Sequence, residues 1–365
     1  MSAISCRLLY RSASPHLQQL YTGFRLLQQS GFLRVSQQMR RTAVRYLDDA
    51  PHLTDAGHAH LDALVEGKLR LHFDTHDAQE IALGELDDCD FYFKRSYLPA
   101  LVDSLPAQQR GKVLPLGMNY RVLADVADSF AMRRALSMTG LSRATLTSFK
   151  QALDIHNRLG FEPRLPQMES PPDPGADPNV LFLVAAYDPH DDPARSRQKI
   201  DDRILINETR ARCIRLLKGA LGPRFTGGFS RSRFTLQHYA DLVVPPDSTA
   251  QASYLRTLKS FPICVASSGL HGSTGWKLAE YVAFSKAILS ERLVYDTPGE
   301  FTPGRNYVEF TSPEECLDGA VRLIEDAALR QQIMRNNETY YRTYLRPDAL
   351  VKNALTTAME KAYQG

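Results

Sequence analysis

Short apolar runs alternate with longer stretches of helical periodicity along most of this chain. The run at 180–186 is continuously apolar, which is typical of a strand that is buried on both faces of a sheet. The second half of the chain shows further elements of these two kinds: strands at 240–244, 263–266 and 287–289, and helices at 207–221 and 275–284. Strands that alternate with helices in this way predict a mostly parallel sheet covered by helices.

The C-terminal part of the chain is expected to be helical. Ser312 can cap a helix, Pro313 suits its first turn, and Glu315 can close a capping box. Two further helices are expected over 327–344 and 347–363. The second half is therefore predicted to be a doubly wound α/β domain with helices appended to it.

The first half shows the same alternation less clearly. The expected elements are strands at 6–10, 69–73, 91–93 and 113–116, and helices at 16–29, 78–86 and 121–138. Residues 40–67 give no clear pattern. The fold class predicted for the whole chain is α/β, with two Rossmann-like, doubly wound domains.

A cluster of prolines marks the domain boundary. Six prolines lie between residues 163 and 178, and proline both fixes φ and lacks an amide donor, so an extended linker is expected there. A chain of 365 residues also exceeds the roughly 250–300 residues of a single core. The expected parts are an N-terminal domain (1–162), the linker (163–178), a C-terminal domain (179–345) and a last helix (346–365) that can pack back on the first domain.

Composition narrows the class of protein. Hydrophobic residues make up 43% of the chain and charged residues 23%, as in globular proteins. A net charge of +3 does not indicate nucleic-acid binding, although it suits an anionic substrate or a peripheral contact with an anionic membrane. The five cysteines have no CxxC spacing, and no apolar run suits a signal peptide or a membrane span. These features predict a cytoplasmic protein with reduced thiols.

The segment 263–289 carries the clearest candidate chemistry. Its strand leads into a loop of small residues, 267–275, and then into a helix that carries Lys277 and Glu280. Ligands of open α/β sheets bind beyond the carboxyl ends of the strands, and a helix N-terminus attracts phosphate. Lys277 would add a positive charge, and Glu280 can accept hydrogen bonds from a ribose diol. The alternative is a tight turn followed by a surface ion pair.

The order of these features resembles the donor half of the GT-B glycosyltransferases. In that superfamily a glycine-rich loop precedes a helix with a glutamate, then a small-residue turn and a short apolar strand, and residues 272–290 follow this order. Residues 298–301 and 304–307 continue the resemblance. It implies two Rossmann-like domains that face each other across a cleft. It also implies a bacterial-type, metal-independent transferase that uses a nucleotide diphosphate sugar as co-substrate, has no other cofactor and acts on an unknown acceptor.

The resemblance also implies a set of donor-binding residues. They are Gly227, Gly228, His271, Gly272, Ser273, Thr274, Lys277 and Glu280. Many retaining members carry two glutamates eight positions apart; Glu280 fits the second, whereas Gly272 occupies the first. A retaining mechanism is therefore not implied, and transfer with inversion fits at least as well.

Three ionisable residues, Asp74, His76 and Asp77, follow the strand at 69–73. Inverting transfer needs a base that removes the proton of the acceptor hydroxyl, and a carboxylate or a histidine can serve. We expect the base to be among these three, with Asp74 as first choice, although Asp77 could instead cap the next helix. Three more polar residues follow predicted strands and are expected to line the acceptor and phosphate side of the cleft: Lys94, Arg95 and Asn119.

Several other activities are disfavoured. No Gly-x-Gly-x-x-Gly follows the expected strands, and no Walker A motif is present, so a dehydrogenase or a P-loop enzyme is not expected. The acidic cluster at 188–192 matches no standard metal-ligand spacing. Two alternatives to a transferase remain, a nucleotide-sugar epimerase of the same fold and a non-catalytic protein that binds a nucleotide or a sugar.

Overall fold

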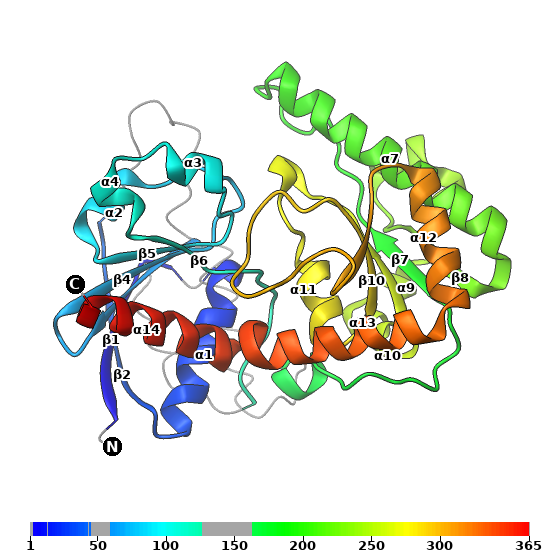
Figure 1. Ribbon diagram of the computed structural model, residues 1–365. Helices are drawn as coiled ribbons and strands as arrows, with labels where there is room; N and C mark the ends of the chain where they lie inside the picture. The colour runs from blue at the N-terminus through cyan, green and yellow to red at the C-terminus, as the bar shows by residue number, and fades with distance from the viewer. Residues whose placement is uncertain (1–2, 13, 43, 45–58, 126–162, 365) are drawn as a thin grey trace. The chain divides into compact units, whose positions relative to one another are not determined.

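The structure is a computed structural model that describes residues 3–12, 14–42, 44, 59–125 and 163–364 (Figure 1). The chain divides into two compact units. Unit 1 consists of Met1–Met168, Tyr295–Glu300 and Arg342–Gly365, and unit 2 consists of Glu169–Val294 and Phe301–Tyr341. The domain boundaries expected from the proline cluster stay a prediction.

Unit 1 is built on a six-stranded sheet. Its strands, in spatial order, are β2 (Leu33–Met39), β1 (Ile4–Tyr10), β3 (His60–Val65), β4 (Leu69–Asp74), β5 (Phe91–Lys94) and β6 (Val113–Pro115). Strand β3 runs antiparallel to both of its neighbours, and all the other pairs are parallel. The expected strands at 6–10, 69–73, 91–93 and 113–116 are confirmed, whereas β2 and β3 were not expected.

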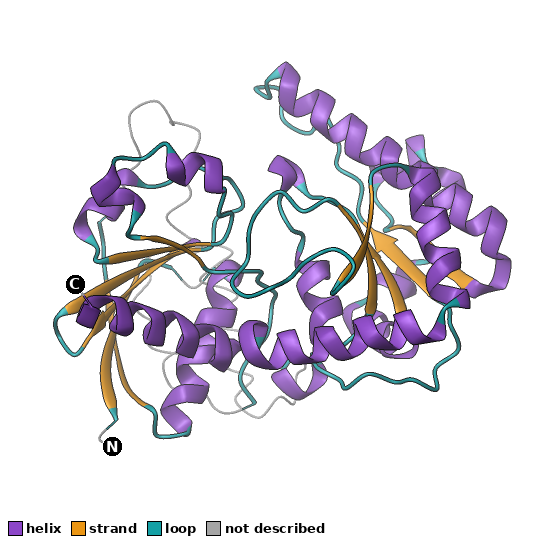
Figure 2. Ribbon diagram, viewed as in Figure 1, coloured by secondary structure: helices purple, strands orange, loops and turns teal. Residues whose placement is uncertain are grey.

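Helices cover both faces of this sheet (Figure 2). Helices α1 (Gln18–Gln29) and α14 (Pro347–Gln364) pack together and share a core with one face, to which alternate residues such as Leu61, Ala63 and Leu71 contribute. Helices α2 (Leu83–Asp88) and α3 (Pro99–Asp103) belong to a smaller apolar cluster that includes Tyr92 of the opposite face. A 3-10 turn (Pro15–Leu17) leads into α1, and α4 (Ala107–Arg110) precedes β6.

The contact between α1 and α14 depends on a glycine, and we expect Gly23→Ala to lower the free energy of unfolding by about 3 kcal/mol. A Cβ at Gly23 would lie 2.1 Å from the carbonyl oxygen of Pro347 and 2.6 Å from Cγ2 of Val351, so a backbone would have to move. Urea denaturation measures the effect. The matched control is Gly219→Ala in a helix of unit 2, where a Cβ would have nothing within 4 Å. Equal stability of the two variants would contradict this packing.

The helix expected over 78–86 is wrong in its first half, because only Leu83–Asp88 is helical. The residues before it form a loop that tertiary hydrogen bonds hold. The Ser96 hydroxyl donates to the carbonyl of Asp77, and the amide of Ala82 donates to the Tyr92 hydroxyl. Asp77 is therefore not a helix cap. Of the helix expected over 121–138, residues 121–125 are not helical and the rest lies outside the described residues.

Unit 2 contains a five-stranded sheet in which every pair is parallel. The strands, in spatial order, are β11 (Tyr307–Phe310), β10 (Ala287–Glu291), β9 (Ile263–Ala266), β7 (Val180–Val184) and β8 (Phe225–Phe229). The two sheets confirm the predicted fold class, two α/β units with sheets rich in parallel pairs.

The strand expected at 240–244 is wrong. Residues Ala240–Leu242 form a 3-10 turn, and the edge strand is β8, whose sequence contains Gly227 and Gly228. A Cβ at Gly227 would lie 2.6 Å from the carbonyl oxygen of Phe182, and one at Gly228 would lie 2.3 Å from that of Leu242. Neighbouring backbones therefore approach β8 so closely at these two positions that a side chain would not fit there. The two glycines, which rarely occur within strands, are required by this packing.

The helices of unit 2 also lie on both faces of its sheet. Helices α7 (Arg197–Leu221), α12 (Pro313–Glu325) and α13 (Ala327–Tyr340) share one core with β7, β9 and β10. The remaining helices are α8 (Arg233–His238), α9 (Pro246–Thr249), α10 (Gln251–Ser260) and α11 (Trp276–Ala283). Among the residues that the structure describes, none of the helices has the length and apolar character needed to cross a membrane.

The start of α12 differs from the expected capping box in one bond. The Ser312 hydroxyl accepts from the amide of Glu315, as expected. The Glu315 carboxylate, however, accepts from the amide and hydroxyl of Thr311 rather than from the amide of Ser312. Both the expected and the observed hydrogen bonds satisfy amide groups at the start of the helix. The residue at which α12 begins was therefore predicted correctly.

Candidate functional site

Unit 2 contains a pocket of about 320 Å³ at the carboxyl ends of β7 and β9. The N-terminus of α11 forms another wall of it, and α7 and α10 contribute one residue each. The lining residues are Val184, Ala185, Tyr187, Arg210, Tyr254, Val265, Ala266, Ser267, Gly269, Gly275, Trp276, Lys277, Leu278 and Glu280. This is the position at which open α/β sheets bind ligands.

Arg210 of α7 is a fixed positive charge in this pocket. Its guanidinium donates to the carbonyl oxygens of Ala185 (2.7 Å) and Ser268 (2.8 Å) and to the Ser267 hydroxyl (2.9 Å). It also lies 5.0 Å from the centre of the Tyr187 ring. These oxygens are neutral, so the hydrogen bonds orient the guanidinium without cancelling its charge.

Lys277 and Glu280 project from the first turns of α11. The Lys277 ammonium lies 3.9 Å from the centre of the Tyr254 ring, and the Glu280 carboxylate accepts a 2.7 Å hydrogen bond from the Tyr254 hydroxyl. Burial lowers the pKa of Lys277 below its usual value, and the charge of Glu280 opposes that shift. Arg210, Lys277 and Glu280 together carry a formal charge of +1, which favours an anionic ligand.

The structure brings together only part of the donor set expected from the sequence. Lys277 and Glu280 line the pocket, whereas Gly272, Ser273 and Thr274 lie outside its lining. The amide of Ser273 closes a turn onto the carbonyl of Leu270, and Ser273 and Thr274 are buried. His271 belongs to a 3-10 turn, Leu270–Gly272. Gly227 and Gly228 lie in β8, where close backbone packing explains them.

Most of the lining residues are absent from the predicted donor set, among them Arg210 and Tyr254. The sequence does offer Arg210 as one of four arginines near the first strand–helix connection of this half that could hold a diphosphate. A detectable signal was present for both Arg210 and Tyr254. Arg210 lies on the same helical face as Asn207, Ala211 and Ile214, which are buried residues of α7. A charged residue on the core-facing side of an amphipathic helix is unusual, and this position was the signal in the sequence. Tyr254 stands four positions before the buried Leu258 on α10.

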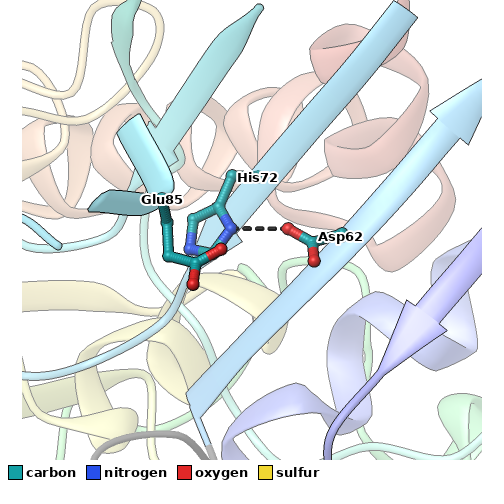
Figure 3. Close-up of side chains that lie close together, drawn as sticks. All are labelled: Asp62, His72 and Glu85. Carbon is teal, nitrogen blue, oxygen red and sulfur yellow. Dashed lines mark hydrogen bonds and ion pairs between the residues drawn. The ribbon is translucent and has the colours of Figure 1, made fainter. Parts of the chain in front are cut away.

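A second concentration of ionisable groups lies in unit 1, on strands β3 and β4 and on helix α2. Asp62, His72 and Glu85 lie side by side there (Figure 3), and a ligand atom from each lies within 4.8 Å of the others. His72 Nδ1 is 2.7 Å from Asp62 Oδ1. Arg11 donates to both carboxylates, at 3.2 Å to Asp62 and 2.9 Å to Glu85, and Arg40 donates to Asp62 at 2.6 Å.

These arginines decide the chemistry of the cluster. Burial alone would raise the pKa of the Asp62 carboxyl, but the hydrogen bond from His72 and the charges of Arg11 and Arg40 hold that pKa well below its usual range. Arg70 adds a third guanidinium, at 3.6 Å from Asp62 and 3.5 Å from Glu85. A divalent cation would have to displace these guanidinium groups, so the cluster suits an internal ion-pair network better than a metal site. Metal independence of the protein stays a prediction.

The network continues across the sheet to Asp74. His72 Nε2 lies 2.9 Å from His60 Nδ1, and His60 Nε2 lies 3.8 Å from Asp74 Oδ1. Asp74 Oδ2 accepts from the Lys94 ammonium at 2.8 Å and from the Tyr92 hydroxyl at 2.6 Å. Burial would raise the pKa of Asp74, but the charges of Lys94 and His60 and the hydrogen bonds from Lys94 and Tyr92 together hold that pKa low. A weakly basic, enclosed carboxylate is poorly suited to take a proton from a substrate.

The loop after β4 places His76 and Asp77 differently from Asp74. His76 Nδ1 accepts from the amide of Ala78 at 3.2 Å, so the hydrogen of the neutral ring is on Nε2. Asp77 is ion-paired with Arg95, yet 41% of its side chain is exposed. Burial lowers the pKa of Arg95 to about 10. His76 can thus donate a hydrogen bond, and Asp77 offers a carboxylate that a substrate can reach.

The two cations expected to line the acceptor side of the cleft are buried and ion-paired. Lys94 is 1% exposed and pairs with Asp74, and the side chain of Arg95 is 2% exposed and pairs with Asp77. Asn119 donates to the carbonyl of His16 at 3.2 Å and is also buried. In this structure Lys94 and Arg95 hold the end of β4 and the loop after it, whereas Asn119 holds the 3-10 turn before α1.

No protein-family model and no curated protein matches the sequence. The chain is similar to the solved C-terminal domain of a group 1 family glycosyl transferase from Francisella tularensis, with 16% identity over 48% of this chain and 96% of that chain and a TM-score of 0.32. It is similar to an α,α-trehalose-phosphate synthase (UDP-forming) from Burkholderia vietnamiensis, with 12% identity over 78% and 63% of the two chains and a TM-score of 0.41.

A third similar structure is the UDP-GlcNAc 2-epimerase from Neisseria meningitidis bound to UDP-GlcNAc, with 11% identity over 94% of this chain and 73% of that chain and a TM-score of 0.37. The similar structures thus include glycosyltransferases and UDP-GlcNAc 2-epimerases. Identities of this size concern the fold alone, so the activity has to be argued from the residues.

Proposed function

We propose that the protein is a glycosyltransferase that takes its sugar from a nucleoside diphosphate sugar bound in the pocket of unit 2. The observation that carries this proposal is the set of charges around the pocket. Arg210 and Lys277 supply two cations beside the N-terminus of α11, and Glu280 supplies a carboxylate three residues further along that helix. A volume of about 320 Å³ lies at the lower end of the range of ligand pockets.

Each charged group suits one part of such a ligand. The amides at the start of α11 and the Lys277 ammonium are donors for a diphosphate, and Arg210 adds a positive charge from α7. The Glu280 carboxylate is an acceptor for the hydroxyls of a ribose. One carboxylate among two cations therefore suits a nucleoside diphosphate better than inorganic phosphate alone.

For the transfer step we propose Asp77 as the base and His76 as a hydrogen-bond donor to the reacting sugar or acceptor. Asp77 has the accessible carboxylate, while Asp74 is enclosed by Lys94 and Tyr92 and holds the loop through the amide of His76. The acceptor is a hydroxyl compound, either free or attached to a membrane, and the product analysis described below identifies it. Lys94 and Arg95 would act by fixing this loop, and Asn119 by holding the 3-10 turn before α1.

The function is tested by binding first and by products second. Trp276, the chain's single tryptophan, lines the pocket, so its fluorescence can follow titration with nucleoside diphosphates and their sugars. Products are then identified by mass spectrometry with and without a panel of hydroxyl acceptors. Transfer, or slow hydrolysis of the donor, supports the proposal. Conversion of the sugar without an acceptor identifies an epimerase, and binding with neither outcome identifies a non-catalytic binding protein.

We expect Lys277→Ala to weaken nucleoside diphosphate binding by about 1–3 kcal/mol, because a charge-assisted contact to the diphosphate is lost. Isothermal titration calorimetry measures the change. The matched control is Lys259→Ala, an exposed lysine on α10 in the same unit, which removes the same charge away from the pocket. Parent-like affinity of Lys277→Ala would place the nucleotide elsewhere.

A further inference from the structure

One side chain contacts both of the charged residues that α11 presents to the pocket. Tyr254 comes from α10, a different helix, and is 9% exposed. Its ring face lies 3.9 Å from the Lys277 ammonium, and its hydroxyl donates to Glu280 Oε2 at 2.7 Å. Because α11 alone would leave both long side chains free to rotate, Tyr254 is the group that relates them to each other.

Both contacts have the geometry of strong interactions. A cation within about 6 Å of an aromatic ring centre is attracted to the negative ring face, and the attraction grows when the cation is desolvated. An O–H donor 2.7 Å from a carboxylate oxygen lies at the length of a charge-assisted hydrogen bond. The ring thus compensates the ammonium for lost hydration, and the hydroxyl orients the carboxylate.

The environment keeps the hydroxyl in its donating form. Burial, and next the charge of Glu280, raise the pKa of Tyr254 well above its usual value, so the hydroxyl keeps its proton at neutral pH. The contact to Glu280 is therefore a permanent donor–acceptor pair.

We propose that Tyr254 is a positioning residue for the nucleotide site: its ring places the Lys277 ammonium for the diphosphate, and its hydroxyl orients the Glu280 carboxylate for the ribose hydroxyls. This inference rests on the proposed function. It assigns the two halves of one side chain to two parts of one ligand. The two effects can be separated by substitution, because Tyr254→Phe removes only the hydroxyl and Tyr254→Leu removes the ring as well.

The test compares three probes by calorimetry. They are the tightest binder among the uridine, guanosine, adenosine and cytidine diphosphates, its 2′,3′-dideoxy analogue, and inorganic pyrophosphate. In the parent we expect the ribose form to bind more tightly than the dideoxy form. Tyr254→Phe is expected to weaken the ribose form about tenfold, as for a hydrogen bond to a charged group, and to leave the dideoxy form and pyrophosphate unchanged. Tyr254→Leu is expected to weaken all three.

The matched control is Tyr239→Phe, since the Tyr239 hydroxyl donates to Glu208 at 2.7 Å in the same unit but outside the pocket. It should leave all three affinities at parent values. If Tyr254→Phe weakens the three probes equally, or none of them, Tyr254 is a packing residue and the inference is overturned while the nucleotide site stands. If the parent binds no nucleoside diphosphate, the proposed function and this inference fall together.

Discussion

Replacing Lys94 with methionine is expected to lower the free energy of unfolding of unit 1 by about 3–5 kcal/mol. The Lys94 ammonium lies 2.8 Å from Asp74 Oδ2, and the two side chains are 1% and 0% exposed. Methionine fills a similar volume but leaves the Asp74 carboxylate buried without its countercharge. Most of the loss therefore comes from the uncompensated anion, and only a small part from packing.

Denaturation in urea followed by two probes can locate this effect. Trp276 lies in unit 2, so its fluorescence follows that unit, while far-ultraviolet circular dichroism follows both. We expect Lys94→Met to shift the dichroism transition to lower urea and to leave the fluorescence transition nearly in place.

Two variants serve as controls for the Lys94 experiment. Lys68→Met removes an exposed lysine from the turn between β3 and β4 and should change stability little. The double variant Lys94→Met with Asp74→Asn should recover part of the loss, because it removes both charges. A Lys94→Met variant as stable as Lys68→Met would show that the ion pair is not buried in solution.

Replacing Asp77 with asparagine is expected to lower single-turnover transfer about 10²–10⁴-fold, the range for loss of a general base. Asparagine keeps the shape and an acceptor oxygen for Arg95, but it cannot take up a proton. Donor affinity should stay at the parent value, because Asp77 belongs to unit 1 and the nucleotide pocket consists of residues of unit 2. Quenched-flow product analysis with saturating donor measures the rate.

The neighbouring residues supply the comparison. Asp74→Asn should act mainly through stability, since Asp74 holds Lys94, Tyr92 and the amide of His76. His76→Ala should slow transfer less than Asp77→Asn does, because only a hydrogen-bond donor is lost. Asp87→Asn, at an exposed carboxylate that accepts from Gln109, is the matched control. If Asp77→Asn turns over like Asp87→Asn, the base does not lie in this loop.

Much of unit 2 could be predicted from the sequence alone. The strands at 180–184 and 263–266 are short apolar runs between helical periods, which is typical of strands buried on both faces of a sheet. The start of α12 follows from Ser312 and Pro313, whose effects are local. The sequence also predicted the helix that carries Lys277 and Glu280, because a loop of small residues before an amphipathic segment marks a helix start locally.

The polar face of the sheet in unit 1 was decided by tertiary structure. Residues of β3, β4 and β5 alternate between an apolar face and a face with His60, Asp62, His72, Asp74 and Lys94. Such alternation normally predicts a solvated face. Here the pairing of His60 with Asp74 and of Asp62 with His72 brings ionisable side chains of neighbouring strands together on the buried face. The partner of each ionisable side chain lies on a neighbouring strand. The sequence of one strand therefore could not show that these side chains are buried.

The composition of the pocket was decided in the same way. Arg210 and Tyr254 lie 67 and 23 positions before Lys277 in the chain, and only the packing of α7 and α10 around β7 and β9 brings them to it. Sequence alone therefore determined the central strands of unit 2 and the local motif of α11, because hydrophobic burial and capping act over a few residues. Tertiary structure decided which distant charges face that motif, because ion pairs, ring contacts and close backbone packing depend on positions that only the complete fold defines.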